Sequence, residues 1–304
     1  MKKALVTGGC GFIGSHIVDR LCEKGVLVSV VDDLSATENE SFFYNSKALY
    51  HEVNILDKNK LEKVFDYFKP DVVFHLAAKA RIQRSIENPQ NTCEVNFGGT
   101  CNVLEFSRKY NVDRVIFSST SSIYGLKNPC PLQEDMPKDC LNPYSISKSA
   151  AEDLCKMYYD LYGLKTVIFR YFNVFGERQP IKGEYAPVIG LFFKQKLSGE
   201  NLTIVGDGLQ TRDFTCVEDV VNANLLAAEI RDEEAFGQVF NVGSGKSNSV
   251  LEISEMIEGV KRFLPERKGE ARNTLANISK IKRVLGYHPV TNLKNWIEKE
   301  KLNC

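Results

Sequence analysis

The stretch VTGGCGFIGSHIVDRL, residues 6–21, joins a short β-branched run to a segment of helical period. Gly8, Gly9, Gly11 and Gly14 satisfy both Gly-x-Gly-x-x-Gly and Gly-x-x-Gly-x-x-Gly spacing. Such a turn needs glycine because its backbone adopts unusual angles and must let a diphosphate approach the main chain closely. The exposed N–H groups and the dipole of the following helix then bind the anion. We therefore expect a diphosphate-binding turn between the first strand and the first helix.

The next strand-like run ends in VVDD, which places Asp32 eighteen residues after Gly14. A carboxylate there can accept a hydrogen bond from an adenosine ribose hydroxyl, and it would repel a 2′-phosphate. The glycine turn together with this acid predicts a dinucleotide site that prefers NAD to NADP. The combination disfavours the alternative of a structural glycine turn without a ligand.

Short β-branched runs alternate with amphipathic stretches through the first 175 residues. This alternation predicts an α/β fold with a parallel, doubly wound sheet and right-handed crossovers, the Rossmann architecture. The expected strands are KALVT (3–7), VLVSVV (26–31), ALYHEV (48–53), DVVFHLAA (71–78), RVIFSS (114–119), TVIFRYF (166–172) and, much later, VFNVGSG (239–245).

The alternation gives way after Gly176 to a loop-rich passage and then to mixed helices and short strands. We expect residues 1–175 to form an NAD-binding Rossmann domain, rejoined by about 215–245. Residues 176–304 are expected to form mainly a smaller α+β substrate-binding lobe, built from non-contiguous segments over the carboxyl edge of the sheet. One compact domain with an elaborate cap is the alternative that the chain length allows.

The composition is that of a globular protein, with 43% hydrophobic residues, 26% charged residues and a formal net charge of zero. Nothing in it favours a nucleic acid or an anionic membrane as a partner. We see no room for a leader before the first strand and no membrane-spanning apolar run, so we expect a cytoplasmic location. The nine cysteines include no C-x-x-C pair and are expected to be reduced thiols, without a metal site.

A second motif, NPYSISKSAAEDL (142–154), predicts a helix whose N-cap is Asn142 and which carries Tyr144 and Lys148 at i and i+4 on one face. A phenol with a pKa near 10 is a poor base, but a nearby ammonium and a cationic nicotinamide would both favour the phenolate. Before this helix, FSSTSSIYG (117–125) brings several hydroxyl groups to the carboxyl edge of the sheet. A Tyr–Lys pair alone is common on helix surfaces, so the prediction depends on the three motifs together.

The motifs TGGCGFIG, YSISK and RYFNVFG resemble an extended short-chain dehydrogenase/reductase of the UDP-hexose 4-epimerase family, from Ala4 to about Tyr287. The resemblance implies NAD as cofactor, with Thr120 as the catalytic hydroxyl, Tyr144 as the base and Lys148 as its partner. It also implies a homodimer, formed by a four-helix bundle of residues 89–110 and 142–163. The cofactor-binding residues that it implies are Gly8, Gly11, Phe12, Ile13, Gly14, Asp32, Asp33, Asn54, Ile55, Leu76, Ala77, Ala78, Ser118, Tyr144, Lys148 and Tyr171. The position of Asn54 is often Asp in the family, so its hydrogen bond can differ here.

Relatives share an oxidation at sugar C4 and differ in the step that follows. Dehydratases carry an Asp-Glu pair directly after the catalytic Thr, and decarboxylating relatives place a Glu two residues after it; this chain has Ser121 and Ser122. A serine cannot replace a carboxylate in acid–base chemistry near neutral pH. We therefore predict 4-epimerisation, with a 4,6-dehydratase as the alternative and a non-catalytic NAD-binding sensor as a more distant one.

The resemblance implies a UDP-sugar held by Asn173, Arg212, Arg267 and Glu270, with guanidinium groups on the diphosphate and the carboxylate on ribose. Thr274 falls where some 4-epimerases carry a bulky Tyr beside the C2 substituent of the sugar. A small residue leaves room for an acetamido group, which favours UDP-GlcNAc and UDP-GalNAc, with UDP-Glc and UDP-Gal also allowed.

Arg81 and Arg84 follow the fourth strand. They would favour a uronate substrate if either faced C6 of the sugar.

Overall fold

The computed structural model describes residues 1–36, 41–181, 187–266 and 271–303. Its centre is a seven-stranded parallel sheet in the order β11-β6-β5-β4-β1-β2-β3. The strands are β1 (Lys3–Thr7), β2 (Leu27–Asp32), β3 (Leu49–Glu52), β4 (Val72–His75), β5 (Arg114–Thr120), β6 (Lys165–Tyr171) and β11 (Gln238–Val242). The order reverses between β1 and β4, so the doubly wound sheet expected from the alternation is confirmed, including the late return of β11.

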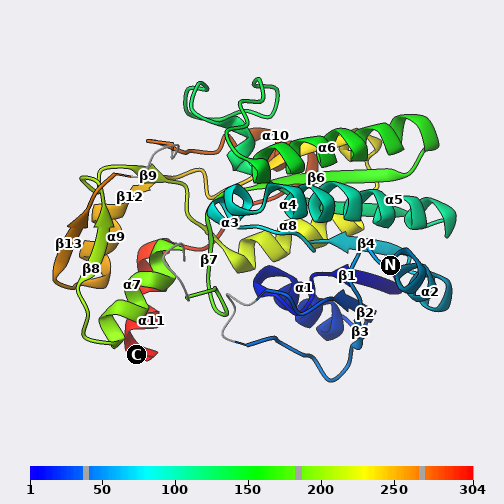
Figure 1. Cartoon of the computed structure of the whole chain (residues 1–304), viewed down its shortest axis with the longest axis horizontal. Helices are drawn as coiled ribbons and strands as arrows, with labels where there is room; N and C mark the ends of the chain where they lie inside the picture. Colours follow the sequence, from blue (N-terminus) through cyan, green and yellow to red (C-terminus); the bar gives the residue numbers. More distant parts are fainter. Residues whose placement is uncertain (37–40, 182–186, 267–270, 304) are drawn as a thin grey trace.

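Helices cover both faces of this sheet (Figure 1). One face packs on α1 (Phe12–Glu23), α8 (Val217–Glu229) and α10 (Ser279–Leu285), and the other on α2 (Lys58–Phe68), α5 (Thr100–Lys109) and α6 (Pro143–Tyr162). Alternate residues of each strand enter the two cores: Ile116 packs with the first set of helices, and Val115 and Phe117 pack with the second. Both faces are apolar because both are buried, as a parallel sheet requires.

The region before α5 differs from the single helix expected over residues 89–110. It consists of α3 (Ile82–Glu87), α4 (Pro89–Cys93) and a π-helical turn at Glu94–Gly99 that leads into α5. The side chain of Asn96 in this turn accepts from the main-chain N–H of Lys79 at 2.7 Å and donates to the Lys79 carbonyl at 3.1 Å. The wider turn thus ties the helix to the loop that follows β4, next to the cavity described below.

A smaller lobe lies at the left of Figure 1, beyond the carboxyl ends of the strands. Its apolar core includes Phe175, Phe193 and Trp296, with Trp296 packing edge-on against both phenylalanines. Its elements are β7 (Val174–Phe175), α7 (Val188–Leu197), β8 (Leu202–Val205), β9 (Thr211–Arg212), β10 (Thr215–Cys216), β12 (Asn248–Ser249), α9 (Val250–Ile257), β13 (Lys261–Leu264) and α11 (Leu293–Asn303). A short 3-10 turn, Glu233–Ala235, precedes β11. None of the helices in the described part of the chain combines the length and apolar character needed to cross a bilayer.

Candidate active site

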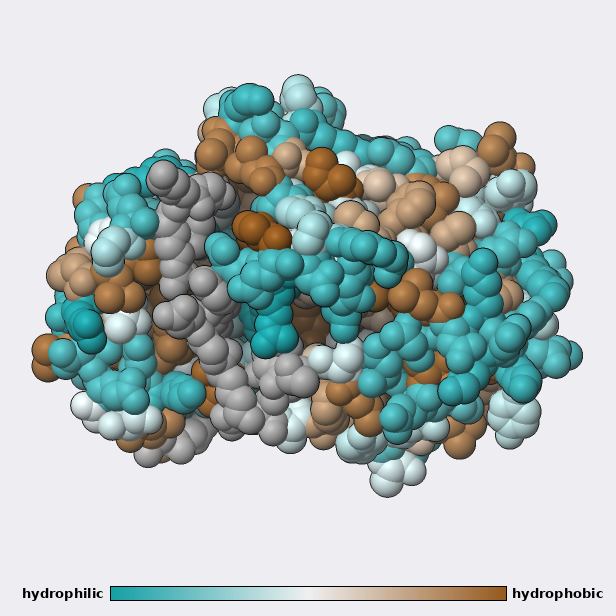
Figure 2. Space-filling model, viewed as in Figure 1, coloured by the Kyte–Doolittle hydropathy of each residue, from teal (hydrophilic) through white to brown (hydrophobic). Residues whose placement is uncertain are grey.

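A cavity of about 1600 Å³ lies between the carboxyl edge of the sheet and the smaller lobe. In the space-filling view of Figure 2, the surface of the molecule is hollowed near its centre, and hydrophilic residues surround the opening. The cavity extends from Asp32 and Asp33 at one end to Arg212 and Thr274 at the other. This volume exceeds that of an ordinary small-molecule site, which is roughly 300–1000 Å³. Two elongated ligands can therefore lie in it together.

The glycine turn has the close packing that a diphosphate cradle requires. Gly8 has a φ of +73°, and a Cβ there would lie 2.7 Å from the main-chain nitrogen of Ala77. A Cβ on Gly14 would lie 2.2 Å from the Gly8 carbonyl oxygen. Gly11 begins α1 without a side-chain cap, so the first N–H groups of the helix point to the turn without a side-chain acceptor. These features fit the pyrophosphate of NAD.

The acidic end of the cavity is held in place by local hydrogen bonds. Asp32 accepts from the main-chain N–H groups of Cys10 (3.0 Å) and Leu34 (2.9 Å), and burial raises the pKa of its carboxyl group. Asp33 accepts from the side-chain amide of Asn54 at 2.8 Å. Asn54 does not line the cavity, whereas the neighbouring Ile55 does. An Asp at position 54 would repel Asp33, so the asparagine explains how this chain orders the second carboxylate.

The middle of the cavity is formed by strand ends. Leu76, Ala77 and Ala78 follow β4 and lie beside the glycine turn, with Phe12 and Ile13 across from them. The hydroxyl groups of Ser118 and Tyr171 lie 3.0 Å apart, and Asn224 donates to the Tyr171 oxygen at 2.8 Å. Burial raises the pKa of Tyr171 to about 12, so this hydroxyl remains protonated. Every expected cofactor residue except Asn54 therefore lines this one cavity.

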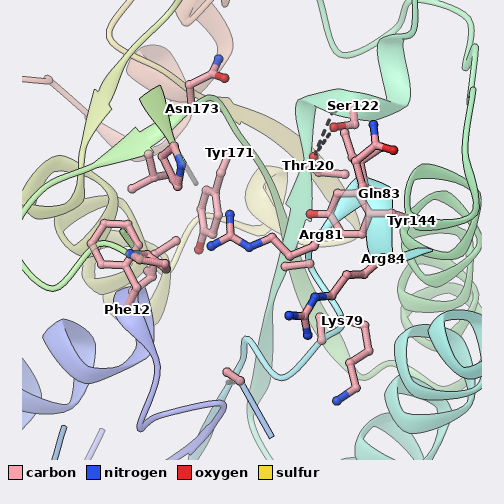
Figure 3. A pocket seen from close by; sticks show the side chains of 18 of the residues that line it. Phe12, Lys79, Arg81, Gln83, Arg84, Thr120, Ser122, Tyr144, Tyr171 and Asn173 are labelled. Carbon is pink, nitrogen blue, oxygen red and sulfur yellow. Dashed lines mark hydrogen bonds between the residues drawn. The ribbon is translucent and has the colours of Figure 1, made fainter. Parts of the chain in front are cut away.

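Thr120, Tyr144 and Lys148 converge at the end of β5. Thr120 is buried and accepts from the main-chain N–H of Ser122 at 3.1 Å, which caps the 3-10 turn Ser121–Tyr124. Tyr144 lies in the first turn of α6, whose expected N-cap Asn142 accepts from the N–H of Ser145 at 2.9 Å. The Thr120 hydroxyl donates to Ser122 Oγ at 3.1 Å and lies close enough to the Tyr144 phenol to lower its pKa. Figure 3 shows both side chains at the cavity wall, with Ser122 beside them.

Burial and a cation from another segment both act on the pKa of the Tyr144 phenol. Burial raises the pKa of Tyr144, and the neighbouring Thr120 hydroxyl and the charge of Arg81 oppose that rise. Lys148 instead donates to the Ser118 carbonyl at 2.7 Å, and burial lowers its own pKa to about 8. The charge of Arg81 therefore opposes the effect of burial on the phenol. The sequence indicated Arg81 as a cavity residue but not this role.

Two further polar residues had no recognisable sequence signal. Gln83 reaches the cavity next to Tyr144 and Thr120 in Figure 3, although a glutamine early in a short helix is typical of a surface. Glu152 is fully buried, accepts from the Ser119 hydroxyl at 2.6 Å and forms an ion pair with Arg170 at 2.7 Å. Glu152 follows Tyr144 and Lys148 at the same helical spacing and joins α6 to both β5 and β6.

At the other end of the cavity, Asn173, Arg212 and Thr274 lie together. The Asn173 amide donates to the Thr274 hydroxyl at 3.4 Å, and Arg212 donates to the Thr211 carbonyl at 3.0 Å. Arg272, by contrast, forms an exposed ion pair with Asp207 at 2.6 Å. The expected ligands Arg267 and Glu270 lie outside the described residues.

His75, beneath the cavity, is fully buried between Thr7 Oγ1 (2.7 Å) and Thr100 Oγ1 (2.9 Å). Burial lowers the pKa of His75 to about 3, with a further contribution from the charge of Lys148. An unfolded histidine titrates near 6.5, so between that pH and the folded pKa the unfolded chain binds a proton that the folded chain does not. The free energy of unfolding should fall as the pH falls through this window.

Urea unfolding of the wild type and of His75→Gln tests this effect. From about pH 7 to about pH 5, the wild type should lose roughly 2 kcal/mol more unfolding free energy than the variant. Equal losses would show that the pKa of His75 is the same in the folded and unfolded states.

Neither this histidine nor any other group within the described residues forms a cluster suited to a metal ion.

Comparison with known proteins supports this reading of the cavity. The model of the NAD dependent epimerase/dehydratase family matches residues 4–243, most of the chain. The chain belongs to this family. The solved UDP-glucose 4-epimerase of Thermotoga maritima, with UDP-glucose, matches this chain at a TM-score of 0.92 and 37% identity. That match covers 99% of this chain and 97% of the other.

Other members of the family have different substrates in their names. A putative UDP-glucose 4-epimerase of Methanocaldococcus jannaschii is 40% identical over 302 residues, covering 97% of this chain and 96% of the relative. The UDP-N-acetylglucosamine 4-epimerase of Methanobrevibacter ruminantium, solved with UDP-N-acetylmuramic acid, matches with a TM-score of 0.91 at 34% identity over 99% of this chain and 97% of that one. A UDP-glucuronate 4-epimerase of Thermodesulfobacterium geofontis is 32% identical over 97% of this chain and 94% of the relative. Family membership therefore establishes the cofactor and the reaction class but leaves the sugar open.

Proposed function

We propose that this protein interconverts UDP-sugars that differ in configuration at C4, with UDP-GlcNAc and UDP-GalNAc as its preferred pair and UDP-Glc and UDP-Gal as further substrates. The observation that carries the proposal is that Tyr144 and Thr120 lie side by side at the wall of the cavity that the glycine turn also lines. A proton acceptor and an orienting hydroxyl are the two protein groups that removal and return of a C4 hydroxyl proton require.

In this proposal, Thr120 orients the C4 hydroxyl and Tyr144 removes its proton. NAD, which the glycine turn and Asp32 would hold, would supply the acceptor for the C4 hydride and the donor for its return. Arg81 favours the charged form of the phenol, and Lys148 holds the end of β5 through the Ser118 carbonyl. Because both faces of C4 must reach the same hydride, the sugar has to turn while Asn173 and Arg212 hold its nucleotide diphosphate.

The residues beside Thr120 favour epimerisation over elimination of water. Ser121 and Ser122 occupy the positions directly after it, and both line the cavity. Elimination needs a second acid and base near C5 and C6, which a serine hydroxyl does not supply near neutral pH. Thr274 supports the preference for N-acetylated sugars, since it is a small residue beside Asn173.

A second candidate is a UDP-uronate 4-epimerase. The charge of Arg81 acts on the Tyr144 phenol, so its guanidinium lies near the position where the sugar reacts, and Arg84 points into the same cavity (Figure 3). A guanidinium is well suited to bind a carboxylate through two parallel hydrogen bonds.

The two candidates are distinguished by incubating the purified protein separately with UDP-Glc, UDP-GlcNAc and UDP-glucuronate, with and without added NAD, and identifying products by NMR. The 4-epimer of UDP-GlcNAc is expected. Turnover of UDP-glucuronate alone would favour the second candidate. A stable 4-keto-6-deoxy sugar would overturn both, because it would place the protein among the dehydratases.

The variant Thr274→Tyr tests whether the small side chain of Thr274 selects N-acetylated sugars. The added ring should occupy the space proposed for the acetamido group and lower kcat/KM for UDP-GlcNAc by roughly 100-fold, while UDP-Glc changes only a few-fold. Thr274→Ser is the control, because it keeps a small side chain and a hydroxyl that can accept from Asn173. An equal loss on both substrates would remove Thr274 as the residue that selects the sugar.

We also infer a homodimer through the surface formed by α4, the π-helical turn and α6. Large apolar residues are exposed here: Phe97 on the π-helical turn, and Ile146, Leu161 and Tyr162 on α6. A neighbouring copy would remove them from water, as expected for a helix-bundle interface.

A further inference from the structure

Asp213 joins β9 to β10 and lies between Arg212 and Phe214, two residues that line the cavity. Its own side chain is fully buried and does not line the cavity. Burial of a carboxylate costs free energy unless several hydrogen-bond donors compensate it. Burial raises the pKa of Asp213, and hydrogen bonds from a hydroxyl group and from main-chain N–H groups oppose that rise.

The donors to this carboxylate come from two segments that are distant from it in sequence. One oxygen, Oδ1, accepts from the main-chain N–H and from the hydroxyl of Ser244, both at 2.7 Å. The other oxygen, Oδ2, accepts from the main-chain N–H groups of Gly245 at 3.0 Å and of Ala276 at 3.1 Å. Asp213 therefore joins the loop that follows β11 to the segment around Ala276.

The segment around Ala276 forms part of the nucleotide-sugar end of the cavity. Thr274 lines the cavity, and its main-chain N–H donates at 3.0 Å to the carbonyl oxygen of the residue before Arg212. The side-chain amide of Asn173 donates to the main-chain carbonyl of Asp213 at 3.3 Å, in addition to its bond with Thr274. The three cavity residues of this end are thus all connected to Asp213 or to a residue next to it in the chain.

We propose that Asp213 is a positioning residue for the nucleotide diphosphate, because its carboxylate fixes the segments that carry Asn173, Arg212 and Thr274 relative to one another. The inference rests on the proposed function, in which Asn173 and Arg212 hold the diphosphate of a UDP-sugar. A binding site that is ordered before its ligand arrives spends less free energy on ordering during binding. Loss of this support therefore weakens binding of the nucleotide more than it slows the reaction of the bound sugar.

The variant Asp213→Asn tests this role, because it keeps the size of the side chain but replaces one acceptor oxygen with an NH₂ group. Whichever way the amide turns, the NH₂ group faces a main-chain N–H, so either Ser244 or Ala276 loses its acceptor. Calorimetric titration of the NAD-saturated protein with UDP should give a Kd at least about 10-fold above that of wild type. The KM of the UDP-sugar that wild type converts should rise by a similar factor, whereas kcat should stay within about threefold of wild type.

Asp219→Asn is the matched control. Asp219 is also a buried carboxylate, and it accepts from the main-chain N–H groups of Val290 at 3.0 Å and Thr291 at 3.2 Å. It lies on α8 and does not line the cavity. The control should lose thermal stability as Asp213→Asn does, but its Kd for UDP should stay within about twofold of wild type.

An unchanged Kd for UDP in Asp213→Asn would overturn the proposal while leaving the proposed function in place. An equal rise of the Kd in Asp219→Asn would also overturn it, because general destabilisation would then explain the loss. So would a fall in kcat with unchanged KM, which would assign Asp213 to the reaction step. If wild type itself does not bind UDP, the proposed function fails, and this inference fails with it.

Gly243→Ala provides a second route to the same question if Asp213→Asn does not fold. A Cβ on Gly243 would lie 2.8 Å from Asp213 Oδ2 and 2.5 Å from the Cβ of Ala276, so these groups must move apart although the carboxylate is kept. The Kd for UDP should again rise at least about 10-fold, since the hydrogen bond to Ala276 is disturbed. A Kd equal to that of wild type in this variant would overturn the proposal.

Discussion

Replacing Tyr144 with phenylalanine should lower kcat by about 10²- to 10⁴-fold, the usual contribution of a general base, while NAD remains bound. The phenol hydroxyl lies at the cavity wall beside Thr120, and the charge of Arg81 lowers its pKa, so its loss removes the proton acceptor. The ring keeps its place in the first turn of α6, because Asn142 and Ser145 cap that turn without the hydroxyl. Product formation by NMR and NAD content by absorbance of the denatured protein's supernatant measure the two effects separately.

Tyr124→Phe provides the matched control for this change. Tyr124 is also buried near the end of β5, but its hydroxyl donates to Asn241 at 2.7 Å and its ring lies under Arg170. Its loss should cost about 1 kcal/mol of unfolding free energy and change kcat only a few-fold. Near-wild-type turnover in Tyr144→Phe would eliminate the tyrosine as the base. Loss of NAD in that variant would instead assign the hydroxyl to cofactor binding.

The variant Gly14→Ala should weaken NAD binding by at least about 100-fold. Its Cβ would lie 2.2 Å from the Gly8 carbonyl oxygen and 2.9 Å from the Gly9 Cα, and main-chain atoms cannot move aside as a flexible side chain can. The turn must therefore shift, and the N–H groups at the start of α1 lose their arrangement around the diphosphate. Equilibrium titration with NAD and thermal unfolding with and without NAD measure the loss.

Gly25→Ala is the control, at the other end of α1. Gly25 has a φ of +74° with no atom within 4 Å of an added Cβ, so alanine there introduces backbone strain without a clash. It should cost roughly 1–2 kcal/mol of unfolding free energy and leave NAD affinity unchanged. Comparable NAD loss in both variants would mean that general destabilisation of α1, and not the cradle, governs binding.

How well the sequence predicted each feature depends on how local the pattern is that specifies it. Three features are specified by short local patterns: the glycine turn, the carboxylate of Asp32 and the capped helix that begins after Asn142. The sequence therefore predicted them, and the structure contains them. The strand order also follows from alternation and the preferred hand of crossovers. Arg267 and Glu270 remain expectations, because they lie outside the described residues.

Other features required coordinates because they depend on the direction of a side chain after packing. The helical spacing and the resemblance placed Lys148 beside Tyr144, but they did not indicate that its ammonium donates to the Ser118 carbonyl or that the charge of Arg81, from a different segment, lowers the pKa of the phenol. Asn54 turns to Asp33 and away from the cavity. The π-helical turn before α5 arises where Asn96 bonds the Lys79 backbone, a contact that no periodicity indicates.

By itself, the sequence determined the doubly wound sheet, the dinucleotide cradle and the identity of the hydroxyl, phenol and ammonium groups at its edge, because these depend on backbone conformation and residue type within short stretches. Only the tertiary structure decided which carbonyl holds the Lys148 ammonium and which carboxylate Asn54 orders. The physical reason is that hydrogen bonds and charge interactions act over a few ångströms, and residues far apart in the chain come within that range only when the whole chain packs.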